Sequence, residues 1–262
     1  MRGITGSFDF EVVPTEVRHG PQSFDVLHLA NGYPLDPEKR ARHARHVEHQ
    51  LERFPEGQFV AVTHQGGREV VVGTATTLRT RRPPEAPPLC WRDVIGDYSL
   101  PRHDPEGAWL YGVEIAVHPD FQRRGIASAL YAARLALVPE LGLEGWYAGG
   151  MLMGYHRFAD VMSPREYAER VLAGELTDPT VTMQLNRGLQ PLAIIEDLDA
   201  YPCSFAHEEL RGLWANLLAT EMVEGNVHID VVRALKEFSV HEVRVLKLIY
   251  TVIVERDEAE RD

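Results

Sequence analysis

The chain has 262 residues, of which 44% are hydrophobic and 25% are charged, so it can bury a sizeable core. Its 39 acidic residues outnumber its 27 basic residues, and the net charge of −12 argues against general nucleic-acid binding, although it suits a cationic amine substrate. Two cysteines are too few for a metal or disulfide framework. The sequence contains no apolar run of about 18 residues and begins with no basic-then-apolar signal, so we expect a cytoplasmic protein without a membrane partner.

The first predicted elements are a strand and a helix. Residues 8–13 (FDFEVV) alternate in the manner of a strand, and Asp36 followed by Pro37 predicts the start of a helix. Three histidines recur along this helix at a spacing of three: His43, His46 and His49. No carboxylate-backed ligand set accompanies them, so we interpret them as a solvated, basic helix face and expect no metal site.

A hairpin and a long loop follow. Residues 58–63 (QFVAVT) and 69–78 (EVVVGTATTL) predict two strands joined by a glycine-containing turn. The loop over 80–108 is basic and then rich in proline, and it leads directly into the next strand. Two interpretations remain open for it: a cover over a substrate site, or a packed surface excursion anchored by Trp91.

The stretch 109–137 organises the chain because it combines a strand, a short turn and a helix. Residues 109–117 are aromatic or β-branched for the most part, with Glu114 as the one charge, and residues 118–121 contain the Pro and Asp of a turn. After the turn, apolar residues recur at helical spacing: Ile126, Leu130, Ala133 and Leu137. This order directs several backbone N–H groups at one place.

The start of that helix is a candidate anion site. The first N–H groups of a helix have no partner inside it, and the helix dipole places partial positive charge there. Gly125 and Ala127 keep bulky side chains away from this end, while Arg123, Arg124 and Ser128 add donors. We therefore expect a phosphate or pyrophosphate to bind here.

Two common phosphate-binding motifs do not fit this loop. The chain has no G-x-x-x-x-G-K-[ST] run, and the turn carries one glycine instead of the G-x-G-x-x-G fingerprint. The pattern V-x-P at 117–119 followed by Q-R-R-G-I-A at 122–127 instead resembles the acyl-CoA loop of the GNAT (Gcn5-related N-acetyltransferase) superfamily. The resemblance implies a mixed α+β fold in which helices flank a central, mostly antiparallel, twisted sheet that is splayed at the acyl-CoA strand.

The same resemblance implies which residues hold acetyl-CoA as co-substrate. A backbone N–H near Val117 is expected to bind the thioester oxygen, with Ile115 and Val117 beside the pantetheine arm. The residues implied for the loop and the helix start are Gln122, Arg123, Arg124, Gly125, Ile126, Ala127 and Ser128.

Glu114 is the candidate general base. It is a lone carboxylate among apolar neighbours, an environment that raises a pKa toward neutrality, and many GNAT enzymes use a glutamate on this strand. The alternative is a structural glutamate that bonds to loop backbone or to an arginine.

The general acid is the point at which the chain departs from the family pattern. GNAT enzymes often carry a tyrosine four residues before the glycine of the last helix–strand turn, and counting back from Gly188 gives Gln184. An amide cannot protonate a thiolate. Tyr155, or else Tyr147, is the expected substitute, with water as a further alternative.

The remaining chain predicts further strands and helices. Strands are expected at 145–148, 191–195 and 243–254, the last with a buried helix as the alternative. One helix is expected to open at residues 163–166, and others are expected at 180–186, 208–218 and 229–238. From about 50 to 200 the chain resembles the acetyltransferase domains that accompany some bacterial carbon–nitrogen hydrolases, although no hydrolase domain is expected here. We predict a GNAT core over 1–200 and an extension over 201–262 that completes the sheet or mediates dimerisation.

The resemblance implies an N-acyltransferase that moves an acetyl group from acetyl-CoA to a primary amine by direct transfer. The expected partners are a small-molecule or peptide amine and a second copy of the chain, with no nucleic acid. The alternative is a catalytically weak or inactive GNAT-fold module that binds acyl-CoA or serves in assembly.

Overall fold

The computed structural model describes residues 8–87, 89, 91–195 and 247–253, which belong to two compact units. The described part of the first unit comprises 8–87, 91–149 and 250–253, and that of the second comprises 89, 150–195 and 247–249.

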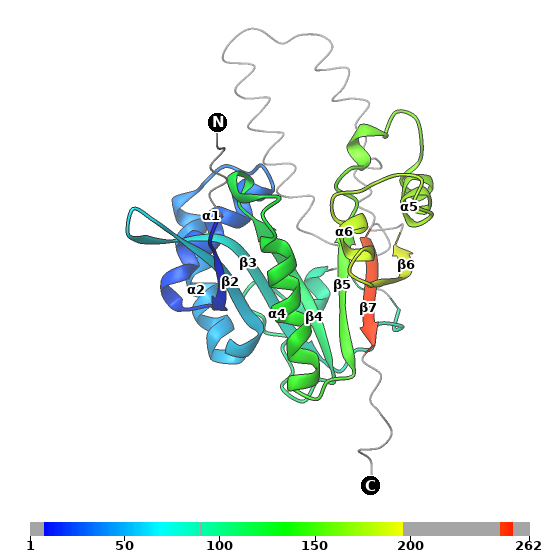
Figure 1. The fold of residues 1–262 in the computed structure, drawn as a ribbon. Helices are drawn as coiled ribbons and strands as arrows, with labels where there is room; N and C mark the ends of the chain where they lie inside the picture. The colour runs from blue at the N-terminus through cyan, green and yellow to red at the C-terminus, as the bar shows by residue number, and fades with distance from the viewer. Residues whose placement is uncertain (1–7, 88, 90, 196–246, 254–262) are drawn as a thin grey trace, which may run out of the picture. The chain divides into compact units, whose positions relative to one another are not determined.

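The first unit is built on a mixed sheet in which β1, β2, β3, β4 and β5 are neighbours in that order (Figure 1). The strands are β1 (Glu11–Pro14), β2 (Gln58–Gln65), β3 (Arg68–Thr80), β4 (Trp109–Val117) and β5 (Gly145–Met151). Neighbours from β1 to β4 are antiparallel, whereas β4 and β5 are parallel. This arrangement confirms the predicted mixed fold with a mostly antiparallel sheet.

Four helices and three 3-10 turns connect these strands. They are η1 (Val17–His19), α1 (Gly20–Ala30), α2 (Pro37–Arg53), η2 (Pro55–Gly57), α3 (Trp91–Ile95), η3 (Pro119–Phe121) and α4 (Ile126–Glu140). Asp36 caps α2 as predicted, because its side chain accepts from the N–H groups of Glu38 and Lys39. The sequence interpretation missed α1, which begins with Gly20 and Pro21 and has no side-chain cap.

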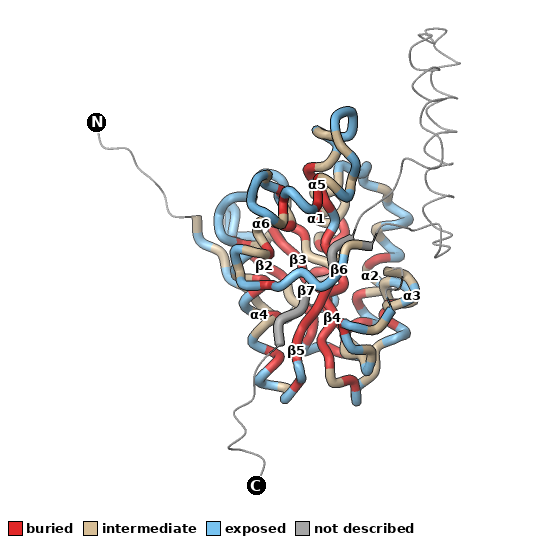
Figure 2. The backbone as a smooth tube through the Cα atoms, turned by 90° about the vertical axis from the view of Figure 1, so that its right-hand side faces the viewer, coloured by how far each residue is buried: buried red, intermediate tan, exposed pale blue. Residues whose placement is uncertain are grey.

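The two faces of the sheet carry separate apolar clusters. Val26 of α1 packs against one face with Val60 and Ala116, whereas Ile126 and Leu130 of α4 cover the opposite face. In Figure 2, α2 and α4 lie on opposite sides of the buried strands. The helix that follows the predicted acyl-CoA loop, α4, therefore covers one face of the sheet, and α1 covers the other.

The predicted solvated histidine face of α2 is wrong at His43. Its side chain is buried against the rings of Phe24 and Tyr98, and this burial lowers its pKa to about 4. His46 is half-buried and His49 is exposed. Within the described ranges, no group of three or more His, Cys, Asp or Glu residues could hold a metal ion.

The loop over 80–108 is packed onto the first unit where the structure describes it. Ile95 and Leu100 are fully buried, and Gln50 of α2 donates to the carbonyl oxygen of Tyr98 over 2.6 Å. The indole Nε1 of Trp91 donates to the carbonyl oxygen of Val113 in β4 over 2.8 Å. These contacts favour the packed excursion anchored by Trp91.

The second unit contains η4 (Tyr155–Arg157), α5 (Pro164–Leu172), α6 (Val181–Leu185) and β6 (Gln190–Ile195). The last three agree with predicted elements, whereas the short η4 was not predicted. The buried Asp178 connects α5 to the segment before η4. Its carboxylate accepts from the N–H of Gly154 over 2.7 Å and from the hydroxyl of Tyr167 over 3.2 Å. None of the helices in the described part of the chain is long and apolar enough to cross a membrane.

The last described element, β7 (Lys247–Ile253), confirms the strand predicted within 243–254. The helices predicted at 208–218 and 229–238 lie outside the described residues, as do the domain boundary at 200 and both cysteines. The division into a core and an extension stays a prediction.

Candidate functional site

A β-bulge in β4 determines where the Glu114 side chain points. In the ladder with β3, Thr77 pairs with Gly112 but Thr76 pairs with Glu114, so Val113 is an extra residue on β4. An added residue reverses the alternation of side chains beyond it. Gly112 faces α4, and without the bulge Glu114 would face α4 too; with the bulge, Glu114 shares the opposite face with Thr76.

Beyond the bulge, β4 separates from β5. The parallel pairing runs from Trp109 with Gly145 to Gly112 with Ala148, while the pairing with β3 continues to Val117. The N–H of His118 bonds to Val72 of β3 over 2.9 Å, so alternation directs the N–H groups of Ile115 and Val117 away from β3. This edge of β4, from residue 113 to 117, is the splay that the fold class predicts.

The two oxygens of the Glu114 carboxyl have different surroundings. Thr76 donates from Oγ1 to Oε1 over 3.2 Å, and Oε2 is buried without a donor among the described residues. Burial raises the pKa of Glu114 to about 7, although the Thr76 hydrogen bond and the charge of Arg134 act in the opposite direction. Near neutral pH this carboxyl is therefore present both with and without its proton.

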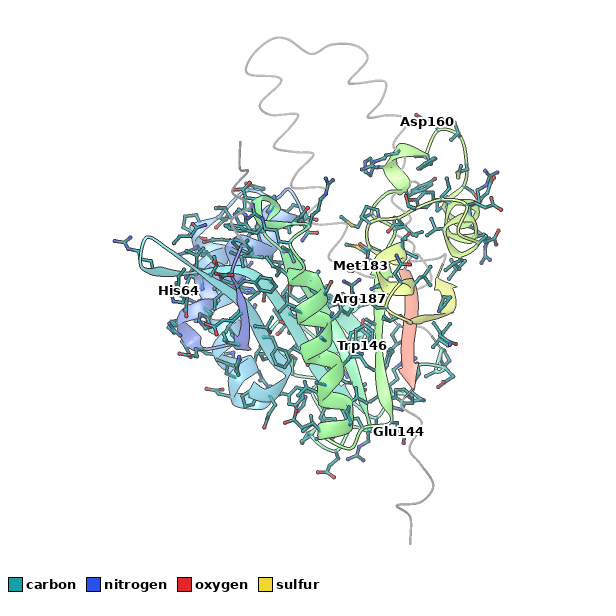
Figure 3. The ribbon with its side chains drawn as sticks, in the orientation of Figure 1. His64, Glu144, Trp146, Asp160, Met183 and Arg187 are labelled. Carbon is teal, nitrogen blue, oxygen red and sulfur yellow. The ribbon has the colours of Figure 1, made fainter. Side chains whose placement is uncertain are left out.

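Arg134 is a functional candidate that the sequence interpretation missed. It lies on α4, its side chain is 1% exposed, and its Nη1 donates to the backbone carbonyl oxygen of Glu114 over 3.1 Å. Its guanidinium carbon lies 4.6 Å from the ring centroid of Tyr131 and 5.3 Å from that of Trp146, which is labelled on β5 in Figure 3. Its position four residues after Leu130, on the inward stripe of the helix, was a signal that could have identified it.

The loop before α4 has the backbone shape of an anion site. Gly125 caps the helix with φ of +84°, and Arg123 also has a positive φ of +62°. The N–H of Ala129 bonds to the carbonyl oxygen of Gly125 over 3.0 Å, and the N–H groups before it are those for which a helix has no internal acceptor. Together with the helix dipole they favour a bound anion.

The predicted loop residues have different exposures. Gln122, Arg123, Arg124 and Gly125 are exposed, whereas Ile126 is 1% exposed and packs in the core. A contact between Ile126 and a ligand is therefore expected from its backbone N–H and not from its side chain. The guanidinium of Arg124 lies 4.6 Å from the ring centroid of Phe8, a cation–π contact that orients it at the loop.

The structure brings the two parts of the predicted binding site together in the first unit. Ile115 and Val117, from the end of β4, pack against the cluster that contains Ile126 at the start of α4. The amide side chain of Gln122 also donates to the carbonyl oxygen of Val117 over 3.3 Å. Glu114 is on the same strand but faces the other side of the sheet.

The two candidate acids belong to different units. Tyr155 belongs to the second unit, where its hydroxyl donates to the carbonyl oxygen of Met162 over 3.1 Å. Tyr147, on β5, donates to the carbonyl oxygen of Arg82 over 3.0 Å, and burial raises its pKa to about 12. Gln184 is buried on α6. The role of Tyr155 as the acid stays a prediction.

Residues 24–152 match the model of the acetyltransferase (GNAT) family. Two curated relatives come from Bacillus subtilis (strain 168). The probable hydrolase YhcX is 34% identical over 160 residues, which are 61% of this chain and 30% of that protein. The uncharacterized N-acetyltransferase YkwB is 29% identical over 147 residues, which are 56% of this chain and 63% of that protein. The chain thus aligns with less than two thirds of either relative.

Solved structures share the fold at low sequence identity. The loading GNATL domain of CurA from Lyngbya majuscula superposes with a TM-score of 0.59 and 14% identity, covering 94% of this chain and 98% of that one. The GNAT-like decarboxylase GphF in complex with isobutyryl-CoA gives a TM-score of 0.53 and 17% identity, with 94% and 100% coverage. These likenesses concern the fold alone.

Proposed function

Residues 24–152 form a domain of the GNAT acetyltransferase family, and we propose that this chain is an acyl-CoA-dependent N-acyltransferase that moves an acetyl group from acetyl-CoA to a primary amine. The observation that carries the proposal is the Glu114 carboxyl: it is enclosed on β4 beside the splay, and burial raises its pKa to about 7. A base with such a pKa can take a proton from an ammonium group near neutral pH.

The proposed reaction needs three contributions from the chain. Glu114 accepts the proton that the amine loses as its nitrogen bonds to the thioester carbonyl carbon. The N–H of Val117 donates to the carbonyl oxygen as negative charge develops there. The carbon–sulfur bond then breaks, and Tyr155 or a water returns a proton to the leaving thiolate.

The binding of acetyl-CoA is proposed for the loop and the first turn of α4. The backbone N–H groups of Gly125 to Ser128 and the exposed guanidinium groups of Arg123 and Arg124 suit a pyrophosphate. Ile115 and Val117 would flank the pantetheine arm. We further propose a small-molecule or peptide amine as acceptor, a cytoplasmic location and a homodimer; the net charge of −12 supports a cationic acceptor.

The second candidate function is an acyl-CoA-binding or assembly module with weak or no catalysis. It is favoured by Gln184, which stands where the family pattern has its tyrosine acid. The named decarboxylase among the fold neighbours adds loss of carbon dioxide from a carboxyacyl-CoA as an outcome to be tested.

Calorimetric titration with acetyl-CoA is the first test, with Gly125→Glu as the disrupting variant and Gly66→Glu as its control. Gly66 has a positive φ of +57° in the β2–β3 turn, so its replacement causes a similar backbone strain away from α4. We expect binding to be lost only with Gly125→Glu. Wild-type protein that binds no acetyl-CoA would overturn the acyltransferase proposal.

Thiol release in the presence of a panel of amines then separates the candidates. An acyltransferase releases CoA in proportion to the amine, and Glu114→Gln should retain acetyl-CoA binding while the amine-dependent rate falls. Binding without release across the panel supports the inactive module. Release of carbon dioxide from malonyl-CoA without an amine supports a decarboxylase.

A further inference from the structure

Two successive backbone carbonyl groups at the β4 bulge accept hydrogen bonds from side chains outside the sheet. Nε1 of Trp91 donates to the oxygen of Val113 over 2.8 Å, and Nη1 of Arg134 donates to the oxygen of Glu114 over 3.1 Å. The register of β4 shifts at these two residues, just after the last pair with β5. Buried carbonyl groups need donors, and here an indole and a guanidinium supply them.

The guanidinium of Arg134 is tightly packed. Arg134 comes from α4 and is 1% exposed, and its guanidinium lies over the rings of Tyr131 and Trp146. A methyl group on Gly112 would come within 3.1 Å of Nη1 of Arg134 and 2.7 Å of Cζ2 of Trp146. Gly112 thus leaves the space that the guanidinium and the indole occupy, and the cation connects α4 to the bulge of β4.

We propose that Arg134 is a positioning residue, which holds the bulge of β4 and thereby keeps the Glu114 carboxyl on the face where it acts as base. This inference rests on the function proposed above. An arginine suits the task because its planar fork can donate to a carbonyl while its face stacks on aromatic rings. A lysine carries the same charge but cannot do both.

The charge of Arg134 has a separate effect on Glu114. Besides burial, the groups that act on the pKa of Glu114 are Thr76 from β3 and Arg134 from α4, and both lower it. Tyr131, one turn before Arg134 on α4, acts on the arginine in turn. Loss of the Arg134 cation should raise the pKa of Glu114. Loss of only the hydrogen bond from Arg134 to the backbone carbonyl oxygen of Glu114 should not.

Two variants separate position from charge. Arg134→Met removes the cation and the donor but keeps an unbranched side chain, and Arg134→Lys keeps the cation without the planar fork. Arg170→Met is the control, since Arg170 is exposed and pairs with Glu166 on α5. We expect amine-dependent kcat/KM to fall roughly ten- to a hundredfold in both Arg134 variants, as for a misplaced catalytic group, and to stay unchanged in the control.

The dependence of kcat/KM on pH separates the two Arg134 variants from each other. In Arg134→Met the acidic limb of kcat/KM should move to higher pH, because the raised pKa of Glu114 leaves less of the free base. In Arg134→Lys the limb should stay in place while the plateau falls. If acetyl-CoA raises the free energy of unfolding equally in wild type and in both Arg134 variants, the fall in kcat/KM arises in the reaction and not in acetyl-CoA binding.

A measurement without turnover keeps the inference independent of the proposed function. Carbon-detected NMR titration of the Glu114 carboxyl and amide hydrogen exchange over 109–117 are made on wild type and the three variants. We expect faster exchange in both Arg134 variants and a higher Glu114 pKa in Arg134→Met alone. These changes in a protein that transfers no acetyl group would overturn the proposed function but leave the structural role of Arg134.

Folded variants whose exchange over 109–117 and whose Glu114 titration match those of Arg170→Met would overturn the inference. If Arg134→Met fails to fold, Arg134→Lys decides it: wild-type exchange together with wild-type kcat/KM in that variant contradicts a positioning role for the planar fork.

Discussion

The hydroxyl of Thr76 on β3 donates to Oε1 of Glu114 on β4 over 3.2 Å, and the two residues also face each other across the ladder. They share a face of the sheet because Val113 is bulged out of register between Gly112 and Glu114. Glu114, the candidate base, therefore has a hydrogen-bond donor on β3, the strand that stays paired with β4 where β4 and β5 separate.

Replacing Thr76 with Val should move the acidic limb of the pH–rate profile to higher pH. The hydroxyl stabilises the ionised carboxylate, so its loss raises the pKa of Glu114 above its value of about 7. Thr76→Ser keeps the hydroxyl and should leave the limb near that of wild type. A limb that does not move in Thr76→Val would show that this hydrogen bond does not influence the reacting group.

Replacing Glu114 with Gln should change how stability depends on pH. The folded-state pKa of about 7 is above the ordinary glutamate pKa of 4.5, so the folded state binds more protons between these values. The wild-type free energy of unfolding should therefore fall, relative to Glu114→Gln, as pH rises from 4.5 through 7. Urea unfolding across this range measures the difference.

Glu48→Gln is the control for this titration, because Glu48 is exposed on α2. Other titrating groups cancel in the comparison between wild type and variant. Parallel stability curves for wild type and Glu114→Gln would contradict the raised pKa of Glu114.

Replacing Gly125 with Ala should weaken acetyl-CoA binding through backbone strain alone. A methyl group there meets no atom within 4 Å, but the φ of +84° is unfavourable for a residue with a side chain. We expect a loss on the order of 1 kcal/mol of stability as well as weaker binding. Gly66→Ala carries similar strain, with φ of +57° and open space, and should lose stability without losing affinity. Equal affinities of the two variants would argue against a ligand at the start of α4.

Replacing His43 with Leu should make the protein more resistant to mild acid. Burial lowers the pKa of His43 to about 4 from the ordinary histidine pKa of 6.5, so its contribution to stability is present above pH 6.5 and is lost as pH falls toward 4. Leucine has no proton to gain, so the stability of His43→Leu should change less over that range. His49→Leu, an exposed change on the same helix, is the control and should follow wild type.

The elements around the candidate acyl-CoA site were predictable because their signals are local. The strand over 109–117, the turn and the helix that begins near Ile126 each follow from residues adjacent in the chain, and the structure confirms all three. The start of α2 followed from Asp36 and Pro37 in the same way. By contrast, α1 was missed because Gly20 and Pro21, which open it, resemble residues that interrupt a helix.

The histidines of α2 show why spacing did not predict burial. His43 and His49 lie on one helix at regular intervals, but His43 is covered by Phe24 of α1 and by Tyr98 of the loop over 80–108. Both covering residues are distant in sequence. The prediction that these histidines are solvated used only the sequence of this helix, so it could not take Phe24 and Tyr98 into account.

The sequence by itself determined the resemblance of the loop at 117–127 to an acyl-CoA loop, the order of strand, loop and helix, and the presence of a carboxylate on the central strand, because each depends on residues close together in the chain. Only the tertiary structure decided the face on which Glu114 lies, since one bulged residue reverses the alternation that a sequence pattern assumes. It also decided the burial of the Arg134 side chain on α4, because the partners that make a buried cation tolerable are a carbonyl of β4 and a ring of β5. Burial and register arise from contacts between distant segments, and these contacts set the pKa of Glu114.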